Sequence, residues 1–95
     1  MGNDPDADLK RAQQLFDLDR AEQARTVAAS VLAARPNSAA ALRLLARCHM
    51  ALGRHHEAVR IAKAAVAVDP GAEQGHRILA TALRRIKNQD RKSVV

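Results

Sequence analysis

One cysteine and four histidines are the side chains in this sequence that suggest a metal site: Cys48, His49, His55, His56 and His76. Zinc sites usually pair their ligands at short fixed spacings, such as two cysteines followed by two histidines. Here Cys48 and His49 are adjacent, and His55 and His56 lie at an expected helix boundary. We therefore expect no metal site, with Cys48 acting as a small apolar residue and His49 packing between helices.

Residue types that enzymes use as nucleophiles or phosphate-binding loops are present without the spacing that such chemistry needs. The four glycines do not form a phosphate-binding pattern, and none of the three serines lies in the strand–turn–helix setting of a nucleophilic serine. The carboxylates gather between residues 4 and 22, where helix starts and solvated surface account for them. The sequence thus predicts no enzymatic activity and no cofactor.

The arginines, in contrast, have a spacing that suits a ligand. Arg43 and Arg47 lie one helical turn apart and share one helix face, and Arg77 follows Arg43 at the same distance that separates Pro36 from Pro70. A guanidinium group can bind a carboxylate through two parallel hydrogen bonds. These residues favour an acidic ligand if the fold brings them onto one surface.

Prolines and glycine indicate the helices that must position these arginines. Pro36 and Pro70 each end a helix, and Gly53 separates two more. Alanine, the best helix former, supplies 21 of the 45 apolar residues, whereas Phe16 is the only aromatic residue. Short connections make consecutive helices antiparallel neighbours. The expected helices cover residues 6–18, 21–34, 38–52, 55–68 and 72–89.

The 34-residue distance between Pro36 and Pro70 is also the period of an internal repeat. Small residues that recur at fixed points let antiparallel helices approach closely, and we expect Leu79, Ala80, Leu83 and Ile86 to form the apolar face of the last helix. The positions in register are Ala24 with Ala58, Ala28 with Ala62, Ala12 with Ala46 and Ala80, and Leu15 with His49 and Leu83.

This pattern resembles the tetratricopeptide repeat family, whose unit is a helix–turn–helix of the same length. The middle unit, residues 39–70, matches the family pattern at Leu42, Leu45, Ala46, His49, Gly53, Ala58, Ala62, Ala65 and Pro70. The first unit, residues 5–36, has Asp8 and Arg11 in place of Leu42 and Leu45, and the third, from residue 73, has only one helix, acting as a cap. The resemblance implies an all-α superhelix, or solenoid, of antiparallel hairpins with five helices. It forms a single domain over residues 6–90, between a flexible segment 1–5 and a frayed segment 91–95.

In this family the first helix of each unit lines a concave groove that binds a peptide. The resemblance therefore implies an adaptor or scaffold that binds an acidic or extended segment of a partner. The first helix makes the apolar end of the groove, which becomes strongly basic toward the last helix, where Arg85 is a further candidate. The implied groove residues are Gln13, Phe16, Arg43, Arg47, Met50, Arg77, Thr81 and Arg84.

The charge distribution leaves two alternatives open. Residues 38–95 carry a net charge of +7 and residues 1–37 a net charge of −1, so the basic helices favour non-specific nucleic-acid binding as one alternative. That region lacks the aromatic side chains that stack on bases. Self-association through the ends of the solenoid is the other. The single cysteine and the lack of a signal-peptide or membrane-spanning pattern favour a cytoplasmic protein without membrane contact.

Overall fold

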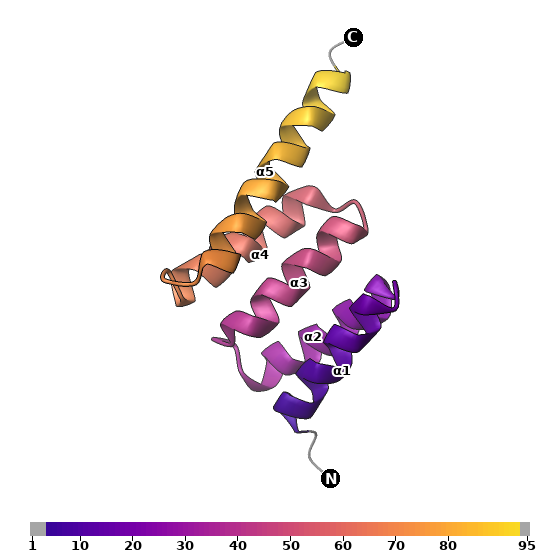
Figure 1. Ribbon diagram of the computed structural model, residues 1–95, viewed down its shortest axis with the longest axis vertical. Coiled ribbons are helices and arrows are strands. Elements are labelled where there is room, and N and C mark those ends of the chain that lie inside the picture. The colour runs from indigo at the N-terminus through magenta and orange to yellow at the C-terminus, as the bar shows by residue number, and fades with distance from the viewer. Residues whose placement is uncertain (1–3, 94–95) are drawn as a thin grey trace.

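The computed structural model describes residues 4–93, with side chains for residues 4–89, as five helices and their short connections (Figure 1). The all-α prediction is confirmed, and most helix ends lie within one residue of their predicted positions. The helices are α1 (Pro5–Asp17), α2 (Ala21–Ala34), α3 (Ala39–Ala51), α4 (His55–Val68) and α5 (Glu73–Ser93).

The last helix is longer than the sequence analysis predicted. It continues to Ser93 because no proline or glycine follows Gly75 to end it. Residues 91–93, predicted to be frayed, therefore belong to α5, and Pro5, from the segment predicted to be flexible, begins α1. Residues 1–3 and 94–95 of those two segments lie outside the described residues.

The turn inside each of the two hairpins places one residue in the left-handed backbone region. Gly53 has a φ of 77° and Asp19 a φ of 65°, and the two positions are one repeat period apart. Glycine adopts this conformation without steric cost, while aspartate tolerates it at a cost of about 1 kcal/mol. At the next position of this register, Lys87 lies inside α5, so the third unit makes no such turn.

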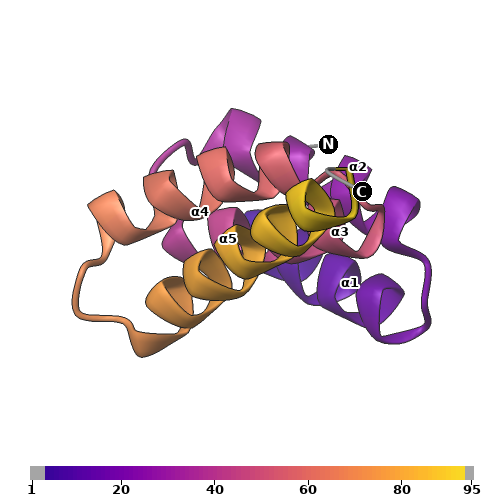
Figure 2. The ribbon, with the colours of Figure 1, turned by 90° about the horizontal axis from the view of Figure 1, so that it is seen from above.

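The helices form two layers, with α1, α3 and α5 on one side and α2 and α4 on the other (Figure 2). Each helix packs against the next one in the chain, and α3 also contacts α1 and α5. This arrangement makes an elongated solenoid of 54 × 28 × 18 Å. The first helices of the three units consequently lie side by side along one surface.

Alanines occupy the points where the helices cross. Ala12 of α1 and Ala24 of α2 are both fully buried, and so are Ala46 of α3 and Ala58 of α4. With one methyl group each, these side chains allow the two helices of a hairpin to pack closely. Leu42, Leu44, Leu45 and Cys48 of α3 complete the middle of the core, with exposed fractions between 0 and 7%.

The predicted packing face of α5 is wrong at two positions. Ala80 is exposed and Leu83 is 48% exposed, although the equivalent Ala12 and Ala46 are fully buried. The reason is that α2 covers α1 and α4 covers α3, while no described helix follows α5. The residues that α5 does bury include Gly75 and Ala82.

Candidate functional site

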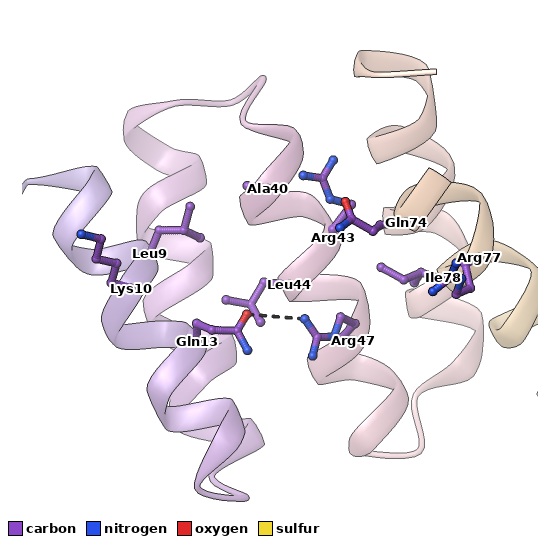
Figure 3. Close-up of a pocket in the computed structure, with 10 residues that line it drawn as sticks. All are labelled: Leu9, Lys10, Gln13, Ala40, Arg43, Leu44, Arg47, Gln74, Arg77 and Ile78. Atoms are coloured by element: carbon purple, nitrogen blue, oxygen red, sulfur yellow. Dashed lines mark hydrogen bonds between the residues drawn. The ribbon is translucent and has the colours of Figure 1, made fainter. Parts of the chain in front are cut away.

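The first helices of the three units enclose a hollow of about 480 Å³ (Figure 3). We call it the basic groove, because four of its lining side chains are cationic and none is acidic. Aliphatic side chains from α1, α3 and α5 lie between the cationic ones. The groove is lined by Leu9, Lys10, Gln13, Ala40, Arg43, Leu44, Arg47, Gln74, Arg77 and Ile78.

Arg43 lines the basic groove from α3, the middle one of its three helices. Its side chain is only 20% exposed, and its Nη1 atom is buried without a hydrogen-bond partner. The nearest acid is Asp69, whose Oδ2 lies 3.9 Å from that Nη1, which is within ion-pair range but too far for a hydrogen bond. The buried Nη1 therefore faces Asp69, and a ligand in the groove can reach only the part of the Arg43 side chain that stays exposed.

Arg47 is held by contacts within the protein instead. Its guanidinium carbon lies 4.6 Å from the centroid of the Phe16 ring, a cation–π distance. Its Nη1 donates to Oε1 of Gln13 at 3.4 Å, across one repeat (Figure 3). Both contacts join α3 to α1, so Arg47 fixes the groove wall and the spacing of these helices.

Arg77 lies at the α5 side of the groove with an exposed side chain. Its Nη2 is 3.7 Å from Oε1 of Glu73, one turn earlier in the same helix, and both side chains are more than 70% exposed. Exposed pairs of this kind contribute about 0–1 kcal/mol. The guanidinium group can therefore exchange this partner for a ligand carboxylate at little cost.

The structure brings half of the eight predicted site residues into the basic groove: Gln13, Arg43, Arg47 and Arg77. Phe16 and Met50 line a smaller adjoining hollow, where Arg47, Ala51 and Arg85 also lie. Thr81 lines neither hollow, and its hydroxyl donates to the Arg77 carbonyl at 2.9 Å. Arg84 is exposed on α5 and lines neither hollow, whereas its neighbour Arg85 lines the smaller one.

Sequence reasoning missed a second series of groove residues. Lys10, Leu44 and Ile78 all line the groove, and they are spaced by one repeat period, one position after Leu9, Arg43 and Arg77. The same repeat register that placed the arginines could have identified this second series. In this series Leu44 and Ile78 give the groove an apolar surface beside the cationic groups.

Cys48 and His49 lie in the α3 core rather than in the groove. Burial raises the pKa of the fully buried Cys48 thiol to about 11. Burial also lowers the pKa of His49, although the carboxylate of Glu57 opposes this shift, and His49 Nδ1 is buried without a hydrogen-bond partner. Within residues 4–89, no three His, Cys, Asp or Glu side chains gather into a group that could hold a metal ion.

A family model described as the tetratricopeptide repeat matches residues 15–82, from the end of α1 into α5. No curated protein matches the chain. Across the described residues, no helix has the length and apolar character needed to cross a membrane.

Proposed function

We propose that this chain, which belongs to the tetratricopeptide repeat family, binds an acidic segment of a protein partner in the basic groove. Repeats of this family generally mediate contacts between proteins and are typically non-enzymatic. The observation that carries the proposal is the lining of the groove, where Lys10, Arg43, Arg47 and Arg77 gather without an acidic side chain. On this basis the protein acts as an adaptor or scaffold.

The lining of the groove indicates the chemistry of the segment. A carboxylate that accepts from the exposed part of the Arg43 guanidinium group makes a charge-assisted hydrogen bond, worth about 1.5–3 kcal/mol. Leu44 and Ile78 offer an apolar surface beside it, where burial contributes about 25 cal/mol per Å². The preferred segment therefore carries an acidic residue next to an aliphatic one.

The three arginines have different roles in this proposal. Arg43 and Arg77 bind the acidic group, since neither is held by a hydrogen bond to another helix. Arg47 is a positioning residue, because its guanidinium group is occupied by Phe16 and Gln13. Loss of Arg47 should therefore lower stability together with affinity, while loss of Arg43 should lower affinity alone.

A fluorescein-labelled peptide with alternating Glu and Leu residues tests the proposal by fluorescence anisotropy. We expect Arg43→Gln to weaken binding about 10- to 100-fold, which corresponds to the 1.5–3 kcal/mol of the lost hydrogen bond. Arg60→Gln is the matched control, because it removes the same charge from an exposed site on α4 where Arg60 pairs with Glu57. The groove assignment is wrong if R43Q and R60Q bind the peptide equally while both keep the wild-type helicity.

Nucleic-acid binding is the alternative that the charge of the groove supports. Phe16 is the only Phe, Tyr or Trp residue of the chain, and the Arg47 guanidinium group lies over one face of its ring. Affinity for an oligonucleotide would come from phosphate contacts and would fall steeply with salt. Titration with a single-stranded oligonucleotide at two salt concentrations tests this alternative. It requires that the oligonucleotide bind more tightly than the Glu-Leu peptide at low salt.

A further inference from the structure

One apolar face of α5 lacks the covering helix that the other two units have. We call it the open face and define it by Leu79, Ala80 and Leu83. The equivalent residues of α3 are Leu45 and Ala46, with exposed fractions of 7% and 0%, and the half-buried His49. Ala80 is exposed and Leu83 is 48% exposed. Of the repeat positions that form the core of a hairpin in α3, two are therefore exposed on α5, while Leu79 is half-buried.

The described part of the chain does not fold back to cover this face. The first two units turn at Asp19 and Gly53, both with positive φ. Lys87 stands at the equivalent position of the third unit, and α5 runs through it to Ser93 as a continuous helix. A helix that covers the open face must therefore approach it from outside the described fold.

The two internal hairpins show what such a helix must look like. In the first, α2 covers α1 with Ala24, Ala28 and Val31 buried, and in the second, α4 covers α3 with its own small side chains buried at the same spacing. Both helices run antiparallel to their partner and present small residues at i, i+4 and i+7. The residues that α4 buries are Ala58, Ala62 and Ala65.

The charge beside the open face selects the partner. Arg84 follows Ala80 by one helical turn, and Lys87 follows Leu83 by one turn, so both cations lie next to the apolar residues. Residues 73–89 of α5 contain four basic residues against a single acid, Glu73. A second copy of α5 would place like charges together, whereas an acidic helix would complement them.

We propose that the open face binds one amphipathic helix of a partner protein, antiparallel to α5. This helix carries small side chains at i, i+4 and i+7 and acidic residues at the flanks of that stripe. The interaction goes beyond the proposed function, since it uses a surface of α5 that the basic groove does not include. The protein then has two docking surfaces, one for an extended acidic segment and one for a helix.

A labelled synthetic helix with alanines at i, i+4 and i+7 and glutamates at the flanks tests this proposal by anisotropy. We expect Leu83→Asp to weaken its binding about tenfold or more, because the substitution places a charge at the centre of the contact. Leu18→Asp is the matched control, since Leu18 is 66% exposed at the other end of the solenoid. Arg43→Gln should leave the binding of this probe unchanged.

Four results would overturn the proposal. The first is that L83D and L18D bind the helical probe equally well. The second is that a probe of the same composition, with its alanines moved out of the i, i+4, i+7 spacing, binds as tightly as the original probe. The third is a concentration-dependent dimer in sedimentation that L83D dissociates, since a second copy would then occupy the face. Loss of probe binding in R43Q would likewise place the probe in the basic groove. A negative result with the Glu-Leu peptide bears on the groove alone.

Discussion

Leucine substituted for Ala46 and, separately, for Ala80 tests whether equivalent repeat positions have the packing that the structure gives them. Ala46 is fully buried in the α3–α4 hairpin, and Ala80 is exposed on the open face of α5. Leucine adds three carbon atoms at either site. Overpacking of this kind costs about 1–3 kcal/mol at a buried position, a large share of the roughly 5–15 kcal/mol that stabilises a small domain. At Ala80 the added atoms have open space, so we expect a change within about 0.5 kcal/mol.

Far-UV circular dichroism during thermal and urea unfolding measures the difference. For a domain of this size, each kcal/mol shifts Tm by about 4–8 °C, so A46L should lower Tm by at least about 4 °C while A80L stays close to wild type. The reasoning is refuted if A46L unfolds with the wild-type midpoint, or if A80L is destabilised as strongly as A46L. The first result would mean that α4 does not cover Ala46, and the second that Ala80 is buried by another surface.

Three further predictions concern His49, the hairpin turns and Cys48. Burial lowers the pKa of His49 in the folded protein, so its contribution to stability is present above the unfolded pKa, near 6.5, and is lost as pH falls through the lower folded pKa. His49→Leu should therefore reduce the stability lost between pH 7 and pH 5 in urea titrations; an unchanged loss would contradict this. Both Asp19 and Gly53 have positive φ, so Asp19→Gly should stabilise the fold by about 1 kcal/mol and Gly53→Ala should destabilise it by about as much. The urea midpoint measures both changes, and shifts in the opposite directions would contradict the turn assignment. Iodoacetamide should label Cys48 at neutral pH only as fast as the protein opens, since the thiol is fully buried with a pKa of about 11; labelling at the rate of the unfolded chain would disprove its burial.

The repeat register predicted much of the fold and part of the groove. The 34-residue period placed the alanine contacts of both hairpins and brought Arg43, Arg47 and Arg77 to one surface, and the resemblance to the tetratricopeptide repeat family is confirmed. The register failed at Ala80, because equivalence between positions does not say whether a covering helix exists. The pairing of Arg47 with Phe16 was also beyond the sequence, since the path of a long side chain depends on its neighbours in space.

The turn at Asp19 shows another limit of the sequence. Glycine at position 53 signals a left-handed residue directly, whereas aspartate is common in many conformations and gives a much weaker signal. The helix boundaries around it were still predicted to within one residue, with the break placed at residues 17–20, where two aspartates stand. Local backbone conformation is thus predicted less well than the position of the break.

The basic groove draws its lining from all three units of a solenoid in which each unit packs mainly against its neighbours. In such a linear array, terminal units can fray independently of the rest. A ligand that touches α1, α3 and α5 together binds only when no unit is frayed, so binding couples the two ends of the array. At a ligand concentration of about 100 times Kd this linkage stabilises the folded array by about 2.7 kcal/mol. A partner would thereby turn a short array into one cooperative folding unit.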